Sequence, residues 1–257
     1  MKPVGLLLAG LACIAAPATA APPQPVTIVA HRGLSEGVPE NTLAAFRRSI
    51  DGGVAIIELD LRVTKDGRLV VVHDASLDRT TNCTGQVAAM ELAQIRACDA
   101  GKGERVPTFA EVLALIRDRP VRILADVKAG TPLEPVLSAI RGHPAGSKII
   151  LGMRSPKQVT RARAALPTTT ILAFIPAASD APDFATAGAN IIRLWSDWAE
   201  TEPALIARIH ALGPEVWITI GRSLPGKPDE WHALHKRMIA AGAQGLITDR
   251  PDLAVAQ

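Results

Sequence analysis

The sequence predicts an α/β fold, a closed (β/α)₈ (TIM) barrel with a small insertion after the second strand. Short apolar runs alternate with amphipathic stretches, as in parallel strands that are joined by helices and buried on both faces. Eight such runs occur, and 257 residues is the usual length of one barrel. We expect strands at Val26–Ala30, Val54–Leu61, Val121–Val127, Lys148–Gly152, Thr170–Phe174, Asn190–Leu194, Glu215–Ile220 and Gly245–Thr248.

The amphipathic stretches between these runs predict the outer helices. Pro39-Glu40-Asn41 precedes one stretch and Pro228-Asp229 precedes another, and both are typical helix starts. Glycines often follow a stretch before the next strand, where a helix commonly ends in a left-handed residue. We expect helices at Thr42–Ile50, Phe109–Arg117, Pro156–Ala165, Glu202–Leu212 and Glu230–Ala241.

A doubly wound open sheet is the alternative fold. It would place a glycine-rich phosphate loop after the first strand. The segment there, Val29-Ala30-His31-Arg32-Gly33, has no such loop. The closed barrel is therefore the preferred prediction.

The insertion is indicated by a second β-like run, Arg68–His73, behind Thr64-Lys65-Asp66-Gly67. Asp-Gly between two apolar runs is a strong hairpin signal. The segment Asp74–Pro107 would then be an excursion of about 34 residues before the next barrel helix, and segments of that length in compact domains are usually functional.

The first twenty residues have the pattern of a secretory signal peptide. Lys2 precedes the apolar run Val4–Ala16, which is too short to span a bilayer, and Ala18-Thr19-Ala20 is a small-x-small cleavage site. A buried N-terminal helix and a lipid anchor at Cys13 are the alternatives. We expect residues 1–20 to be removed, residues 21–257 to form a single barrel domain, and the protein to be exported, either periplasmic or secreted.

Composition excludes several classes of partner. The net charge of +3 is small, no basic run occurs, and there is no Tyr among the 257 residues. Nucleic-acid binding, which needs basic patches and stacking aromatics, is therefore not expected. A stable membrane span is not expected either, and the sequence gives no oligomeric state.

Two cysteines, Cys83 and Cys98, would remain after cleavage. In an exported protein such a pair favours a disulfide, which here would stabilise the fold by roughly 3 kcal/mol in the chain-entropy model. Two buried free thiols are the alternative.

Polar residues gather where the predicted strands end, the rim at which barrels carry their active sites. Glu58 and Asp60 are two residues apart, so both carboxylates point to the same side of the second strand while Leu59 points outward. Asp126 ends the next barrel strand. Three converging carboxylates repel one another unless a cation joins them, and oxygen ligands suit Mg²⁺ or Ca²⁺. Independent ion pairs with Arg32, Arg62 or Lys128 are the alternative.

Two histidines lie at the same rim. His31 follows the first strand and His73 ends the hairpin run. Imidazoles titrate near neutral pH, so we expect one to accept a proton from a nucleophile and the other to donate one to a leaving group. Arg32 and Lys128 would offset the negative charge of a phosphoryl group.

At these residues the sequence resembles the glycerophosphodiester phosphodiesterase family over essentially the whole mature chain. The most specific part runs from His31 to Thr81. The matching blocks are His31-Arg32-Gly33, Pro39-Glu40-Asn41-Thr42, Glu58-Leu59-Asp60-Leu61, Val71-Val72-His73-Asp74, Leu77-Asp78-Arg79-Thr80-Thr81, Asp126-Val127-Lys128, Val216-Trp217 and Ile247-Thr248-Asp249-Arg250-Pro251.

The resemblance implies a metal-dependent enzyme that cleaves small glycerophosphodiesters to sn-glycerol 3-phosphate and an alcohol. The implied metal ligands are Glu58, Asp60 and Asp126, with His31 and His73 as general acid and base. Arg32 and Lys128 would contact phosphate or support the site, and Trp217 is a further candidate substrate contact. Apart from the resemblance, Arg222 is a candidate phosphate contact because it follows a predicted strand end.

The chain departs from the family pattern at three places. Asp126 replaces the usual Glu, Leu151-Gly152-Met153-Arg154 stands where Ser-Phe is common, and Thr219-Ile220-Gly221-Arg222 replaces Thr-Val-Asn. The head group and the choice between Mg²⁺ and Ca²⁺ therefore stay open. A lysophospholipase D-like or other phosphodiesterase, and a non-catalytic phosphodiester-binding protein, are the alternative functions.

Overall fold

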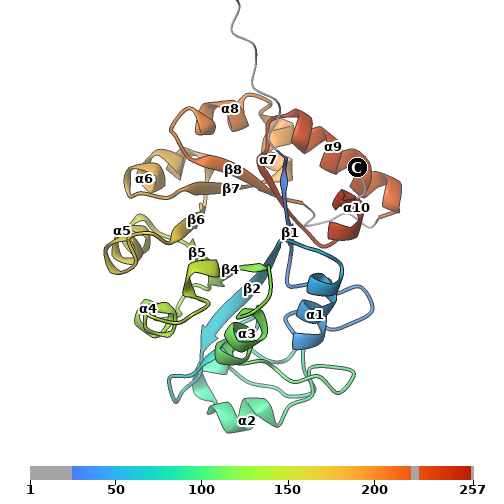
Figure 1. Cartoon of the computed structure of the whole chain (residues 1–257), viewed down its shortest axis with the longest axis vertical. Helices are drawn as coiled ribbons and strands as arrows, with labels where there is room; N and C mark the ends of the chain where they lie inside the picture. The colour runs from blue at the N-terminus through green and yellow to red at the C-terminus, as the bar shows by residue number, and fades with distance from the viewer. Residues whose placement is uncertain (1–24, 221–225, 256–257) are drawn as a thin grey trace, which may run out of the picture.

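A computed structural model describes residues 25–220 and 226–255, which form a closed barrel of eight parallel strands surrounded by helices (Figure 1). The barrel closes because β1 pairs with both β2 and β9, so that the parallel sheet has no free edge. The predicted closed barrel is confirmed. Its strands are β1 (Thr27–Ala30), β2 (Ile56–Val63), β4 (Arg122–Val127), β5 (Ile149–Met153), β6 (Thr170–Phe174), β7 (Ile191–Trp195), β8 (Glu215–Thr219) and β9 (Gly245–Thr248).

The helices lie outside the barrel, and several begin at side-chain caps. Thr42 accepts a hydrogen bond from the backbone of Ala45, and Ser155 accepts one from Gln158. Such caps satisfy backbone donors that have no partner within the helix. The helices are α1 (Leu43–Asp51), α2 (Leu92–Arg96), α3 (Phe109–Ile116), α4 (Leu133–Ile140), α5 (Pro156–Ala165), α6 (Ala181–Thr186), α7 (Ser196–Thr201), α8 (Leu205–His210), α9 (Pro228–Ala240) and α10 (Pro251–Val255).

One helix is shorter than the sequence pattern predicts. The predicted Glu202–Leu212 begins only at Leu205. Pro203 disfavours a helical conformation at the residue before it, and Glu202 is accordingly non-helical, with φ −129° and ψ 86°, at the end of α7. None of the helices in the described ranges has the length and apolar character needed to cross a bilayer.

Alternation along the strands separates two apolar layers. Leu59 points outward into the layer between barrel and helices, together with Ile57 and Leu61. Side chains from alternate positions, among them Val29, Leu124 and Leu172, fill the barrel interior. Above this interior layer, at the carboxyl ends of the strands, the inward positions are polar. The barrel therefore has a polar rim at the carboxyl ends of its strands and a packed apolar layer beneath it.

The insertion after β2 is present. β3 (Leu69–Val71) pairs antiparallel with β2 through the predicted hairpin. Behind it the chain encloses a small core of its own and forms α2, which lies outside the ring of barrel helices in Figure 1. The Cys83–Cys98 disulfide closes this segment, with Cα atoms 5.7 Å apart. The predicted disulfide is confirmed.

Candidate active site

A cavity of about 890 Å³ opens at the carboxyl ends of the barrel strands. Its walls include residues of β2, β4, β6, β7, β8 and β9 and residues that directly follow β1 and β5, so side chains far apart in sequence face one space. Both predicted histidines and two of the three predicted metal ligands line it, and Asp60 lies buried beside them. The lining residues that lie on β2 or β4, or that follow β1, β3 or β4, include His31, Arg32, Glu58, His73, Asp126 and Lys128.

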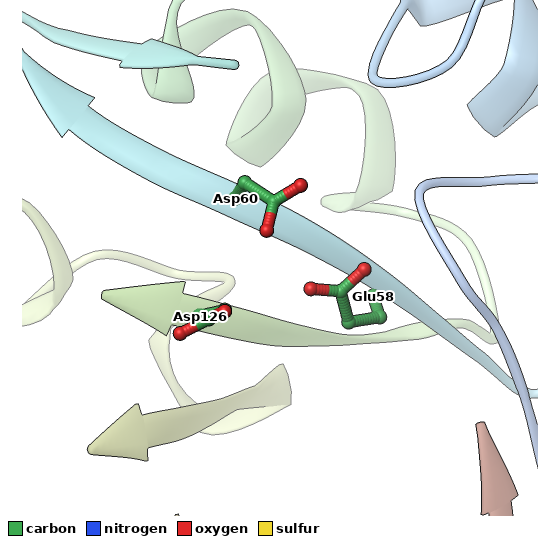
Figure 2. Close-up of side chains that lie close together, drawn as sticks. All are labelled: Glu58, Asp60 and Asp126. Atoms are coloured by element: carbon green, nitrogen blue, oxygen red, sulfur yellow. The ribbon is translucent and has the colours of Figure 1, made fainter. Parts of the chain in front are cut away.

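The three carboxylates converge as the strand geometry predicts (Figure 2). Glu58 and Asp60 are on β2, and Asp60 is the register partner of Asp126 on β4. One oxygen from each carboxylate lies within 4.8 Å of the others, and all three side chains are buried. Neighbouring parallel strands therefore bring the three carboxylates into one cluster.

Local cations neutralise part of this cluster. Lys128 Nζ lies 2.6 Å from Asp60 Oδ1 and 2.7 Å from Asp126 Oδ2. Arg154 makes two contacts with Asp126, one of them from Nε to Oδ1 at 3.1 Å. Burial raises the pKa of Asp60, but the charges of Lys128, His73 and Arg32 outweigh it and lower the pKa to about 2. The ion pairs considered as an alternative are therefore present for Asp60 and Asp126.

Glu58 differs from the other two carboxylates. It accepts a hydrogen bond of 2.9 Å from the backbone N–H of Arg32, and His31 Nε2 lies 4.0 Å away. Burial, followed by the negative charge of Asp60, raises the pKa of Glu58 to about 8. This carboxylate therefore has too little positive charge around it to stay ionised easily.

The residues of the cluster fit a divalent metal ion. Three buried carboxylates each offer an oxygen to a common point, and Glu58 has a raised pKa that an added cation would reverse. An all-oxygen donor set suits a hard cation such as Mg²⁺ or Ca²⁺. The cluster is thus a candidate metal site.

Each rim histidine is oriented by a carboxylate. His31 Nδ1 lies 2.7 Å from Asp249 Oδ1, and His73 Nδ1 lies 2.6 Å from Asp74 Oδ1. Because an ionised carboxylate only accepts, Nδ1 carries the proton in both rings. In the neutral form, Nε2 of each imidazole is then left to accept a proton. Both rings are prepared for proton transfer in the same way.

The two imidazoles have opposite pKa shifts. Burial lowers the pKa of His31, but the hydrogen bond to Asp249 and the charges of Glu58 and Asp249 outweigh it and leave the pKa raised. The pKa of His73 is lowered, chiefly by burial and then by Lys128, against the opposing effects of Asp60 and Asp74. The two rings therefore favour different protonation states under the same conditions.

An ion-pair network joins the first strand to the insertion. Arg79 Nε donates to Asp74 Oδ2 at 2.6 Å, and Arg79 Nη2 donates to Glu40 Oε1 at 2.7 Å. Arg32 Nη1 also donates to Glu40 Oε1, at 3.0 Å. The network holds Asp74, and through it His73, in a fixed relation to the loop after β1.

That loop depends on one glycine. Gly33 has φ +80°, and a Cβ at this position would come within 2.9 Å of Ala45 Cβ. Only glycine combines this conformation with such close packing against α1. In the His31-Arg32-Gly33 sequence, Gly33 is therefore required by the local structure, while His31 and Arg32 supply side chains to the cavity.

One of the candidate substrate contacts, Trp217, does not reach the cavity. Trp217 is buried in the barrel interior, where its indole covers Gly245 and Nε1 donates to Glu215 Oε2 at 2.8 Å. Glu215 begins β8, so the indole faces the amino end of the barrel, away from the cavity. The missing side chain of Gly245 provides the space that turns the ring in this direction. Arg222 lies outside the described residues.

Several residues to which the sequence analysis assigned no role take part in the site. Asp249 holds His31, and the Asn41 amide donates to Asp60 at 2.7 Å. Arg154, Phe174 and Arg193 line the cavity. Arg193 and Asp249 could have been predicted from the sequence as site residues. Arg193 is a charged residue inside the apolar strand Ile191-Ile192-Arg193-Leu194, and Asp249 directly follows a strand.

Comparisons with known proteins agree with this geometry. The model of the Glycerophosphoryl diester phosphodiesterase family matches residues 31–253. A glycerophosphodiester phosphodiesterase of Caldanaerobacter subterraneus is 32% identical over 240 residues, which cover 89% of this chain and 96% of that protein. The crystal structure of a glycerophosphodiester phosphodiesterase from Agrobacterium tumefaciens is 28% identical, has a TM-score of 0.76, and is matched over 90% of this chain and 100% of its own.

A more distant structure has the same fold. It is a phosphodiesterase from Oleispira antarctica in complex with the product sn-glycerol-3-phosphate, with 21% identity and a TM-score of 0.73 over 89% of this chain and 94% of that one. The family match spans nearly all of the described chain, and it confirms the resemblance carried by the sequence motifs. This protein belongs to the glycerophosphoryl diester phosphodiesterase family.

Proposed function

We propose that this protein is a metal-dependent phosphoric diester hydrolase that converts glycerophosphodiesters to sn-glycerol 3-phosphate and an alcohol. Family membership supports the reaction class. The observation that carries the proposal is the joint placement of His31, His73 and the acidic cluster in one cavity, with each imidazole held at Nδ1 by a carboxylate.

The two histidines transfer the protons. Nε2 of one ring takes a proton from the attacking hydroxyl, either of water or of the substrate's own glycerol. The other ring, protonated, gives a proton to the alcohol oxygen as its bond to phosphorus breaks. When the glycerol hydroxyl is the nucleophile, this step leaves a cyclic phosphate. Water, deprotonated by the ring that is now neutral, then opens it, and the first ring returns its proton to the glycerol oxygen. Asp249 and Asp74 stabilise the imidazolium form of their respective partners, as a carboxylate does in a catalytic triad.

Charge on the phosphoryl oxygens is offset by the chain's own cations. Arg32 and Lys128 both line the cavity, and each lies beside the acidic cluster. A guanidinium and an ammonium held there stabilise negative charge that grows on the phosphoryl group. Glu58, Asp60 and Asp126 would hold a Mg²⁺ or Ca²⁺ ion, which supplies Lewis-acid polarisation of a phosphoryl oxygen.

The decisive experiment measures release of glycerol 3-phosphate from glycerophosphocholine and glycerophosphoethanolamine, with Mg²⁺, Ca²⁺ or EDTA. We expect metal-dependent turnover. His31→Ala and His73→Ala should each lower kcat by about 10²- to 10⁴-fold, the usual contribution of general acid–base catalysis. His210→Ala is the matched control, because His210 Nδ1 contacts the backbone oxygen of Pro214 far from the cavity lining.

Metal binding is tested separately by thermal unfolding. A metal that binds only the folded state stabilises it by about 2.7 kcal/mol at a concentration 100 times its Kd. We expect Mg²⁺ or Ca²⁺ to raise the Tm of the wild-type protein and to have a much smaller effect on Asp60→Asn. Equal Tm values with metal and with EDTA would contradict the metal site.

The same assay separates the alternative functions. Faster turnover of lysophosphatidylcholine than of glycerophosphocholine would indicate a lysophospholipase D-like enzyme. Binding of the diesters without turnover under any metal would indicate a non-catalytic binding protein. Loss of activity in both histidine variants together with EDTA sensitivity would support the proposed mechanism.

We also propose that the protein is exported. The pattern of residues 1–20 supports this, and the Cys83–Cys98 disulfide suits an oxidising compartment. N-terminal sequencing of protein from cells that express the whole chain should find Ala21 as the first residue. An N-terminus at Met1 would contradict cleavage.

A further inference from the structure

The cavity has two chemically different sides. The β1–β4 side carries the histidines and the acidic cluster described above. The β5–β7 side is formed by the carboxyl ends of β5, β6 and β7, at the left of the barrel in Figure 1. Its lining side chains are Arg154, Phe174, Arg193 and Trp195.

Strand alternation explains why these side chains enter the cavity. On β7, Ile192 and Leu194 pack outward, so Ile191, Arg193 and Trp195 point inward. On β6 the inward residue next to Arg193 is its register partner, Phe174. Two inward arginines, one of them Arg154 just after β5, therefore lie next to one phenyl ring.

A glycine makes room for that ring. The Phe174 ring lies over Gly152 of β5, where a Cβ would overlap ring atom Cε2. Gly152 has an ordinary backbone conformation, so it is the space, and not a positive φ, that requires glycine here. The Leu151-Gly152-Met153-Arg154 sequence, which departs from the family pattern, thus places the ring and one arginine together.

The arginines cover the aromatic faces. Arg154 Cζ is 5.0 Å from the Phe174 ring centroid, and Arg193 Cζ is 5.1 Å from the same centroid. Arg193 Cζ also lies 4.0 Å from the Trp195 ring centroid. These are cation–π distances. The protein's own cations therefore already interact with both rings in the way that a quaternary ammonium group would.

Charge on this side is positive. Among the described residues between 150 and 248 that line the cavity, there are two arginines and no Asp or Glu. Arg154 is balanced by Asp126, with which it forms an ion pair. Arg193 is 5% exposed, and a charge so far from bulk water acts strongly on any ion that reaches it. Metal binding at the acidic cluster would add further positive charge to the cavity.

We propose that the β5–β7 side binds a second anionic group carried by the leaving alcohol, and that Arg193 is the residue that selects it. The preferred substrates are then glycerophosphodiesters whose alcohol is itself phosphorylated, rather than those with a choline or ethanolamine head. The glycerol part is neutral and common to all such diesters, so only the alcohol can supply the second negative charge. This inference rests on the proposed function.

The test compares two substrates that differ in one phosphate group: glycerophosphoinositol and glycerophosphoinositol 4-phosphate. We expect kcat/KM to be about tenfold higher for the phosphorylated diester, as a charge-assisted contact to arginine would give, and lowest for glycerophosphocholine. The ratio should decrease as ionic strength rises, because salt screens charge interactions.

Arg193→Gln should reduce this ratio to about one, whereas Arg193→Lys, which keeps the charge without the planar fork, should retain part of it. Arg161→Gln is the matched control, because Arg161 is exposed on α5 and pairs with Glu134. A wild-type ratio of one, or a ratio that Arg193→Gln leaves unchanged, would overturn the inference while the proposed function stands. Absence of turnover on every diester would overturn both.

Discussion

The two sides of the cavity hold their polar groups by different means. On the β1–β4 side each key group is fixed by a directed hydrogen bond, as between His31 and Asp249 or between His73 and Asp74. On the β5–β7 side Arg193 stacks on two rings, and Arg154 stacks on one of them while it also pairs with Asp126. A hydrogen bond fixes which atom carries a proton, while stacking fixes only where a charge lies. The first arrangement suits proton transfer and the second suits recognition of a charged substrate.

The largest effect is expected from a substitution that breaks the hydrogen bond between His31 and Asp249. In Asp249→Asn the amide can also donate, which favours the tautomer with the proton on Nε2 and removes the proton acceptor from the cavity. We expect kcat to fall by about 10³-fold, while the Tm changes little. Steady-state kinetics on glycerophosphoethanolamine measure this.

Asp229→Asn, at an exposed position in the first turn of α9, is the control for that substitution. A loss in Asp249→Asn of less than tenfold would mean that orientation by Asp249 is not needed. Directed hydrogen bonds would then not distinguish the function of the β1–β4 side from that of the β5–β7 side.

The next effect concerns the disulfide in the insertion after β2. Cys83 and Cys98 are 15 residues apart in sequence, and a cross-link of that span stabilises a fold by about 3 kcal/mol in the chain-entropy model. We expect Cys83→Ala/Cys98→Ala to lower the free energy of unfolding by this amount. Urea denaturation gives the free energy of unfolding of the variant and of the oxidised wild type. Values for the two proteins that differ by less than about 0.5 kcal/mol would contradict a stabilising role of the disulfide.

A smaller effect is expected where the β5–β7 side depends on close packing. Gly152→Ala would drive a methyl group into the Phe174 ring and should cost about 2 kcal/mol, as overpacking usually does. It should also lower the kcat/KM ratio between the two inositol substrates, because the ring that supports Arg193 moves. A double-mutant cycle with Phe174→Leu checks the cause, since the cost of Gly152→Ala should then be much smaller. If the free-energy costs of Gly152→Ala and Phe174→Leu simply add, the strain does not come from contact between the new methyl group and the Phe174 ring.

The last effect, similar in size to the previous one, is a pH dependence of stability at His235, which lies behind β9. His235 on α9 is buried, and its Nε2 lies 3.0 Å from Thr248 Oγ1, next to Asp249. Burial, followed by the charge of His232 and opposed by Asp252, lowers the pKa of His235 from 6.5 to about 4. Between these values the unfolded chain binds more protons, so the free energy of unfolding should fall as the pH drops from 6.5 toward 4, by about 2 kcal/mol.

Urea denaturation across this pH range tests the expectation, with His235→Gln as the comparison. The variant lacks the titrating ring and should lose less stability than the wild type between pH 6.5 and 4. Parallel curves for the two proteins would show that His235 does not set the pH dependence.

The amino-acid sequence alone determined the barrel and most of the β1–β4 side. The predicted strands agree with the observed ones to within two residues at each end, and the shared direction of Glu58 and Asp60 followed from strand alternation. The hairpin after β2 followed from Asp66-Gly67. These features are local, because side-chain alternation, turn chemistry and apolar periodicity are set by neighbouring residues.

Only the tertiary structure decided which distant groups meet. Asp249 reaches His31 across 218 residues of sequence because β9 pairs with β1, with Thr248 opposite Ala30. The directions of long side chains were decided by the space that facing residues leave. Trp217 turns toward the amino end over Gly245, and Phe174 turns over Gly152 between two arginines. Such choices depend on closure of the barrel and on close packing across strands, which no local pattern in the sequence specifies.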